Sequence, residues 1–151
     1  MEATVLYFSS SGKTSDMAAR LTDCLRRLGC KVLATSLDEA RESDLGRGGM
    51  LFVGSPAWSG EQVVPALDEF VRDHVERLAG ARVAFFGSYD WGDGLYFDAL
   101  AEFLRGKVAA VHAKPLLSKL DEPSLSDEVV ATFAAEVLAE ASLAAERPDA
   151  D

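Results

Sequence analysis

A hydroxyl-rich segment follows the first apolar run of the chain and has the residue types of a phosphate-binding loop. Residues 9–15 read Ser-Ser-Ser-Gly-Lys-Thr-Ser, directly before a pattern typical of an amphipathic helix. Hydroxyl and backbone N–H donors at a helix N-terminus, with the helix dipole behind them, bind anionic oxygens. A simple helix N-cap needs only one hydroxyl. The segment therefore predicts a phosphate site.

The triplet Gly12-Lys13-Thr14 also fits the end of a nucleoside-triphosphate-binding loop. That motif requires a further glycine at the position where this chain has Tyr7. The apolar run at residues 50–53 is not followed by the aspartate that would hold magnesium. The dinucleotide motif G-x-G-x-x-G is also missing. A nucleotide-hydrolysing switch therefore has only this triplet in its favour.

The only two tryptophans of the chain, Trp58 and Trp91, lie in two further loops rich in glycine and serine. Residues 54–60 read Gly-Ser-Pro-Ala-Trp-Ser-Gly, and residues 87–94 read Gly-Ser-Tyr-Asp-Trp-Gly-Asp-Gly. Each indole either folds back onto the core or faces the other across a slot. Two flat rings beside a phosphate loop favour the slot, which would sandwich a planar heterocycle. The predicted ligand is a monophosphate that carries a large aromatic ring.

The segments between these loops predict alternating strands and helices. Continuously apolar runs, typical of strands covered on both faces, occupy residues 5–8, 32–34, 50–53, 83–86 and 109–111. Four helices are predicted from apolar stripes at helical spacing, formed by Met17, Leu21, Cys24, Leu25 and Leu28, by Leu67, Phe70, Val71, Val75 and Leu78, by Phe97, Leu100 and Leu104, and by Leu125, Val129, Phe133 and Val137. Residues 37–45 have room for a turn or two of helix. This order predicts an α/β fold with a parallel sheet and helices on both faces, with ligands at the carboxyl edge of the sheet.

Length and charge limit the domain count and the partners. A chain of 151 residues is about one domain long, and 15 Lys and Arg against 25 Asp and Glu give a formal net charge of −10. Such a charge repels nucleic acid and anionic membranes and favours basic protein partners. We expect one domain at residues 1–141, followed by an acidic, frayed tail at residues 142–151 that has no apolar stripe.

The cysteines, histidines and chain start indicate neither a metal site nor export. Cys24 and Cys30 are too few for a disulfide framework and form no Cys-x-x-Cys motif, so we expect packing roles for them. His74 and His112 have no partner at ligand spacing, so no metal is expected. The chain start resembles no leader, and no apolar run approaches the ~20 residues of a membrane span. We therefore expect a cytoplasmic protein.

The three loops together resemble the flavin-binding motifs of the flavodoxin family. Residues 9–14 resemble its [T/S]-x-[T/S]-G-x-T phosphate loop, and residues 87–94 resemble its Gly-Ser-Tyr-Gly-Trp-Gly-Asp-Gly loop. Residues 54–60 resemble its other ring-binding loop. The similarity spans about residues 3–140 and lacks the insertion that long-chain members carry in the fifth strand. The chain therefore looks like a short-chain flavodoxin.

This resemblance implies a doubly wound, five-stranded parallel sheet of strand order 2-1-3-4-5 and one non-covalently bound FMN. The phosphate is expected on residues 9–14, the ring between Trp58 and Trp91, and the pyrimidine edge on the backbone of residues 88–93. The peptide 59–60 is expected to change orientation with redox state. The residues expected to bind FMN are Ser9, Ser10, Ser11, Gly12, Lys13, Thr14, Ser55, Pro56, Ala57, Trp58, Ser59, Gly60, Ser88, Tyr89, Asp90, Trp91, Gly92 and Asp93.

The implied function is low-potential one-electron transfer by a monomer. It would shuttle electrons between redox proteins with basic docking surfaces and have no catalytic residue of its own. The alternative is an FMN-dependent quinone or flavin reductase on the same fold, for which so short a chain has little room. Lys13 stands where the family commonly has Asn, and Asp90 where it commonly has Gly. Together with Asp93 and Glu61, Asp90 would place negative charge near the flavin, so we expect the two departures to affect the redox potentials.

Overall fold

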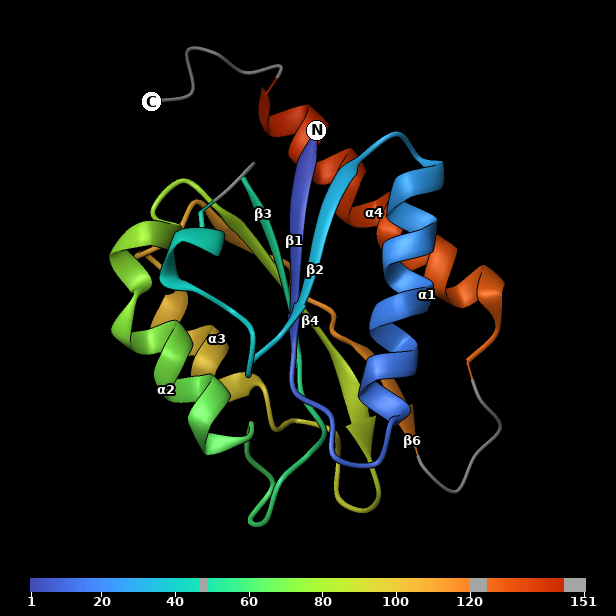
Figure 1. Cartoon of the computed structure of the whole chain (residues 1–151), viewed down its shortest axis with the longest axis vertical. Coiled ribbons are helices and arrows are strands. Elements are labelled where there is room, and N and C mark those ends of the chain that lie inside the picture. Colours follow the sequence, from blue (N-terminus) through green and yellow to red (C-terminus); the bar gives the residue numbers. More distant parts are fainter. Residues whose placement is uncertain (47–48, 120–124, 146–151) are drawn as a thin grey trace.

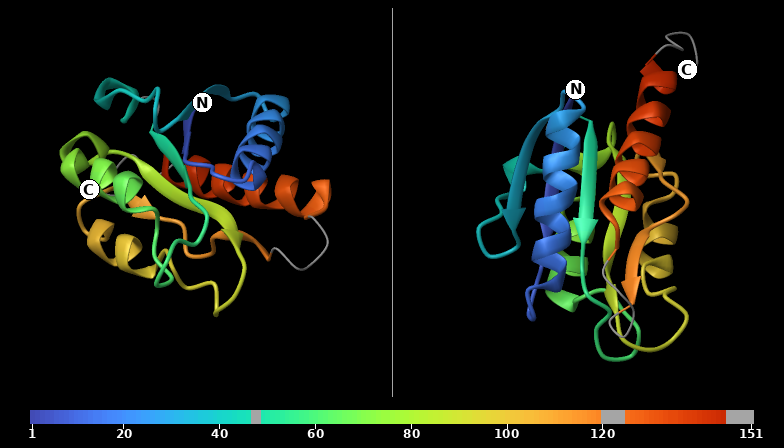
Figure 2. Two further views of the ribbon diagram at one scale, coloured as in Figure 1. Left: turned by 60° about the horizontal axis from the view of Figure 1, so that its bottom comes forward. Right: turned by 90° about the vertical axis from the view of Figure 1, so that its right-hand side faces the viewer.

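The computed structural model of the chain describes residues 1–46, 49–119 and 125–145, which form three layers (Figures 1 and 2). The central sheet consists of β1 (Glu2–Tyr7), β2 (Lys31–Ser36), β3 (Met50–Gly54), β4 (Arg82–Tyr89), β5 (Ala110–Val111) and β6 (Leu116–Lys119). One face is covered by the helices α1 (Lys13–Arg27) and α4 (Asp127–Ala145), the other by α2 (Pro65–Asp73) and α3 (Asp98–Leu104). Two short 3₁₀ helices, η1 (Glu42–Asp44) and η2 (Val75–Leu78), complete the described elements.

The strand order β2-β1-β3-β4-β5, with every pair parallel, confirms the predicted doubly wound topology. At the fifth position of the sheet, two short strands replace the single strand expected at residues 109–111. β5 pairs with the start of β4, and the unpredicted β6 pairs with its end, from Phe86 to Tyr89. Residues 112–115 separate β5 from β6 and include Pro115, which has no N–H to donate to a ladder.

Each face of the sheet has its own apolar core, because successive strand residues point to opposite sides. Phe86 packs with α1 and α4, whereas its neighbour Phe85 packs with α2 and α3. The Phe85 ring stacks on Phe97 with a centroid distance of 4.7 Å. Both faces of β4 are therefore buried, which explains the continuous rather than alternating apolar pattern of this strand.

The helix stripes are only partly as predicted. Leu28 is 51% exposed because α1 ends at Arg27, one residue before it. Val129 is 46% exposed, and the adjacent Val130 takes its place in the core together with Phe133. The second stripe does not form one helix, since His74 separates α2 from η2. For Leu28 and Val129, an apolar residue lies just outside the face that the packing selects, whereas every member of the second stripe packs in or against the core.

Three further features complete the scaffold. α4 continues to Ala145, so residues 142–145 are helical rather than part of a tail, and residues 146–151 lie outside the described residues. The imidazole Nδ1 of buried His112 lies 2.9 Å from the Glu140 carboxylate, which Arg82 also contacts at 3.1 Å. This cluster ties α4 to the sheet. None of the helices in the described ranges is both long and apolar enough to cross a membrane.

The two cysteines have the packing roles expected of them. Cys30 is buried and Cys24 half-buried, and both are free thiols. Burial raises the pKa of each thiol above its ordinary value. Because the thiolate is the reactive form, a raised pKa makes both side chains poor nucleophiles.

Candidate functional site

Three loops meet at the carboxyl edge of the sheet because the strands before them are in register. Tyr7 at the end of β1 pairs with Gly54 of β3, and Gly54 in turn pairs with Phe86 of β4. The loops that leave these strands gather at one end of the molecule, the lower end in Figure 1. The strand order reverses between β1 and β3, and doubly wound sheets bind ligands at this point.

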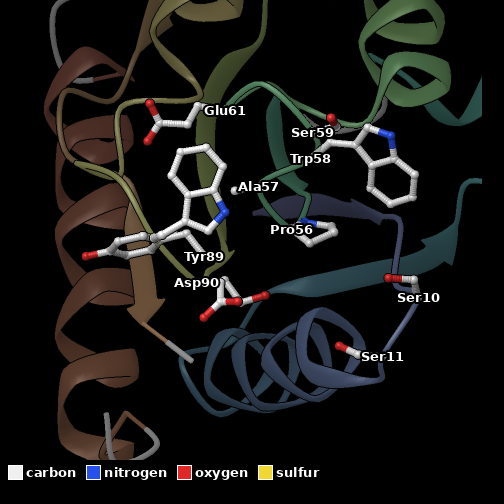
Figure 3. Close-up of a pocket in the computed structure, with 11 residues that line it drawn as sticks. Ser10, Ser11, Pro56, Ala57, Trp58, Ser59, Glu61, Tyr89 and Asp90 are labelled. Carbon is white, nitrogen blue, oxygen red and sulfur yellow. The ribbon is translucent and has the colours of Figure 1, made fainter. Parts of the chain in front are cut away.

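A hollow of about 310 Å³ lies between the three loops (Figure 3). Its lining residues are Ser10, Ser11, Pro56, Ala57, Trp58, Ser59, Glu61, Ser88, Tyr89, Asp90 and Trp91. Figure 3 shows Ser11 beside the start of α1, and Trp58 and Tyr89 on opposite sides of Pro56 and Ala57. The fold thus brings together residues from all three loops of the expected site, together with Glu61.

The end of the hollow beside α1 is rich in hydrogen-bond donors. The N-cap of α1 is Gly12, whose φ of +89° is in the left-handed region that favours glycine. Its N–H donates to the Ser9 Oγ at 3.1 Å, and no side chain in the described residues caps the helix. The first N–H groups of α1 and the exposed hydroxyls of Ser10 and Ser11 are thus the donors at this end. An anionic phosphate complements such a helix end.

The other expected site residues lie beneath or beside the hollow. Thr14 and Ser55 are buried, and the Thr14 Oγ1 lies 3.5 Å from the Ser88 Oγ, which joins α1 to β4. Ser9 and Gly12 line a separate hollow of about 200 Å³. The remaining members of the expected set, which are at least partly exposed, are Lys13, Gly60, Gly92 and Asp93.

The two tryptophans border the hollow from different loops. Trp58 is 39% exposed, and its indole packs edge-on against Phe8 with a centroid distance of 5.8 Å. Its backbone N–H donates to the Gln62 carbonyl at 2.8 Å, which closes a short hairpin. Trp91 is 64% exposed, so its indole does not fold back onto the core. Large exposed apolar side chains grouped beside a hollow mark a binding site.

Glu61 connects the two tryptophan loops and is absent from the set of FMN-binding residues expected from the sequence. Its carboxylate accepts the backbone N–H of Asp93 at 3.2 Å, and its φ of +54° is unusual for a residue other than glycine. From the sequence alone, Glu61 is expected only to contribute negative charge near the flavin. Its position directly after the loop at residues 54–60 is the signal that could have identified it as a lining residue.

The peptide between Ser59 and Gly60 is held in one orientation by a neighbouring side chain. The Ser59 carbonyl accepts the Gln62 side-chain amide at 2.9 Å, and Gly60 has a φ of +80°. A change in the orientation of this peptide would break the bond to Gln62. Such a change stays a prediction from the resemblance.

The residues present fit FMN. The donor-rich end beside α1 suits the phosphate, and the exposed faces of Trp58 and Trp91 suit the planar ring. When bound, FMN supplies the redox chemistry, and the chain supplies binding and charge. The described residues contain no group of three or more His, Cys, Asp or Glu placed to hold a metal ion. By fold and site, the molecule is a doubly wound α/β protein with a mononucleotide site.

The chain belongs to the flavodoxin family, whose sequence model matches residues 5–135. The flavodoxin of Megasphaera elsdenii is 25% identical over 119 residues, which cover 78% of this chain and 87% of that protein. The flavodoxin of Clostridium beijerinckii is 26% identical over 125 residues, 82% of this chain and 90% of that protein. Members of the family bind FMN and transfer electrons, so FMN is the cofactor and electron transfer the function.

A solved structure shares the fold. Oxidised flavodoxin 1 from Bacillus cereus matches with a TM-score of 0.78 and 24% identity, covering 92% of this chain and 98% of that one. The family match confirms the short-chain flavodoxin predicted from the sequence motifs, and the structural match confirms its fold.

Proposed function

We propose that this chain is a one-electron carrier that holds FMN in the hollow between the three loops. The FMN phosphate lies on residues 9–14, and the ring lies between Trp58 and Trp91. The observation that carries the proposal is the hollow itself, which combines the uncapped start of α1 with two exposed indoles from separate loops. The full set of eighteen residues expected from the sequence is proposed to bind FMN, directly or by supporting the loops, and Glu61 is added to it.

The purified protein tests this proposal directly. After mixing with FMN and removal of the excess, we expect one flavin per chain, with absorption bands near about 375 and about 450 nm, typical of any oxidised flavin. Stepwise anaerobic reduction should then resolve two one-electron potentials. A chain that retains no FMN at equimolar concentration would refute the proposal.

We further propose that the protein transfers electrons without a substrate reaction of its own. The hollow of about 310 Å³ is about the size of one ligand, and the described chain adds no further loop over it. We therefore expect reduction by NAD(P)H only when a separate reductase is present. Steady-state oxidation of NAD(P)H by the purified protein alone would instead favour the quinone or flavin reductase.

We propose that the protein is a monomer in the cytoplasm. Its proposed partners are redox proteins with basic docking surfaces. The formal charge of −10 supports this choice, because such a field speeds encounter with a basic surface and slows encounter with an acidic one. Glu61 and Asp90 concentrate negative charge at the hollow, next to exposed Trp91. Association rates with a basic partner should therefore fall as salt is added.

Replacing Asp90 by Asn is expected to raise the second one-electron potential. Full reduction places negative charge in the hollow that Asp90 lines, and removing a carboxylate weakens the repulsion. An exposed pair of like charges is worth about 0.2–1 kcal/mol, or about 10–40 mV for one electron. Glu136→Gln, on the exposed face of α4, makes the same charge change and should leave the potential within a few millivolts. Equal shifts in both variants would show that only net charge matters.

Replacing Lys13 by Asn is expected to weaken FMN binding by up to about fivefold and to leave riboflavin binding unchanged. Lys13 is the half-buried first residue of α1, where its ammonium can reach a phosphate on the loop. A partly exposed ion pair contributes about 0–1 kcal/mol, which gives this factor. Lys114→Asn, an exposed site with the same charge change, is the control. If FMN and riboflavin respond equally, Lys13 does not contact the phosphate.

A further inference from the structure

The Tyr96 side chain lies directly beneath the two tryptophan loops. Its ring is buried, with 4% of the residue exposed, and it packs on Phe97 at a centroid distance of 4.4 Å. Its hydroxyl donates to the carbonyl of Ser55 at 2.6 Å and lies 3.4 Å from the carbonyl of Ser88. Ser55 is the first residue after β3, and Ser88 is the second-last residue of β4. One hydroxyl thus contacts the base of both loops.

The carbonyl groups that Tyr96 contacts belong to a connected network. The Ser55 Oγ accepts the backbone N–H of Val64 at 3.0 Å and donates to the Pro56 carbonyl at 2.8 Å. The Ser88 carbonyl also accepts the backbone N–H of Ala57, at 2.7 Å. Ser55 is therefore bonded to Pro56 at the start of the Trp58 loop and to Val64 just before α2, and Ala57 of the same loop is bonded to β4.

The Tyr96 hydroxyl is closely packed against the backbone of β4. Gly87 directly precedes Ser88 in β4, and a Cβ at this position would lie 2.2 Å from the Tyr96 oxygen and 1.9 Å from the Ser55 carbonyl oxygen. Burial raises the pKa of the Tyr96 hydroxyl well above its usual range. The group therefore stays protonated and remains a donor at any working pH.

We propose that the Tyr96 hydroxyl is a positioning group that sets the separation of the Trp58 and Trp91 loops, and with it the affinity of the site for the flavin ring. Tyr96 does not line the hollow, so it acts through the Ser55 and Ser88 carbonyls. Without it, the Ser55 carbonyl loses a buried donor, and the loop can shift to find another. The inference rests on the proposed location of FMN in this hollow.

Tyr96→Phe tests the inference because it removes the hydroxyl and keeps the ring. We expect FMN and riboflavin to bind about 5- to 20-fold more weakly, by the same factor, since the phosphate end is untouched. In the flavin-free protein, the Ala57 and Val64 amides should exchange faster with solvent, while amides of the central strands keep their rates. Thr22→Val, which removes another buried hydroxyl, from α1, is the matched control and should change neither readout.

The measurements distinguish failure of the proposed FMN site from failure of the role of Tyr96. Absence of FMN binding to the parent protein refutes the proposed function, whereas the exchange rates of Ala57 and Val64 still test the role of Tyr96 in holding the loop. If the parent binds FMN and Tyr96→Phe binds FMN and riboflavin within twofold of it, the inference is overturned. It is also overturned if only FMN binding falls, or if Thr22→Val causes the same loss. Uniformly faster exchange would indicate a purely structural role and overturn it as well.

Discussion

Gly87→Ala is expected to destabilise the protein and to weaken FMN binding more than tenfold. The added Cβ would lie 1.9 Å from the Ser55 carbonyl oxygen and 2.2 Å from the Tyr96 oxygen. Neither can move away cheaply, because one is backbone and the other belongs to a buried ring. Overpacking of this kind costs typically about 1–3 kcal/mol, occasionally more. The Tm of the flavin-free protein should fall by several degrees, at about 2–4 °C per kcal/mol for a domain of this size.

Gly80→Ala is the matched control for this prediction. A Cβ at Gly80 meets no atom within 4 Å, so the substitution adds the same methyl group without a clash. We expect an unchanged or slightly raised Tm and parental FMN affinity, since Ala restricts the unfolded chain more than Gly does. Unfolding is measured without flavin, because bound ligand by itself raises the Tm. A Gly87→Ala protein with the Tm and FMN affinity of Gly80→Ala would contradict the packing described here.

Trp58→Ala and Trp91→Ala are each expected to weaken FMN and riboflavin binding about 10- to 100-fold. Aromatic stacking contributes about 0.5–1.5 kcal/mol beyond burial, and covering each ring face removes apolar area from water at about 25 cal/mol per Å². If each indole covers about 40–50 Å² of apolar surface, the two terms amount to about 1.5–2.8 kcal/mol, which corresponds to the stated factor. Because both indoles are partly exposed, their removal should leave the stability of the flavin-free protein nearly unchanged.

Leu95→Ala is the control for the tryptophan variants. Leu95 is 62% exposed and follows the Trp91 loop, but it does not line the hollow of about 310 Å³. Its removal should not affect flavin affinity. Each tryptophan variant retains a single indole, so quenching of its fluorescence by FMN also reports how close the remaining ring lies. Parental affinity in either tryptophan variant would show that the ring is not held between the two indoles.

Much of this fold follows from local sequence patterns. The continuous apolar runs located the first four strands, and alternation with helical stripes predicted the parallel sheet whose order the structure confirms. The boundaries were less well determined. Val129 and Val130 are equally apolar neighbours, and only packing against α1 decides that Val130 faces the core. β6 was missed because only two apolar residues precede Ser118 and Lys119.

Local features of the sequence are enough to predict the chemistry of the candidate site. Hydroxyl groups before a helix, and two tryptophans in glycine-rich loops after apolar runs, are local features that can be identified without knowing the fold. They were sufficient to predict a phosphate loop and an aromatic slot, and to recognise the family that the comparisons then established.

How these loops are held depends on contacts that form only in the folded protein. The Tyr96 hydroxyl meets the Ser55 carbonyl across 41 positions of sequence, and Glu61 meets the Asp93 N–H across 32. In both bonds one partner is a backbone group, which every residue has, so no residue type in the sequence marks it. Thr14 likewise carries the hydroxyl of a phosphate loop, yet it is buried against Ser88 because α1 packs close to the end of β4. These contacts exist only once parallel strands far apart in the chain are in register.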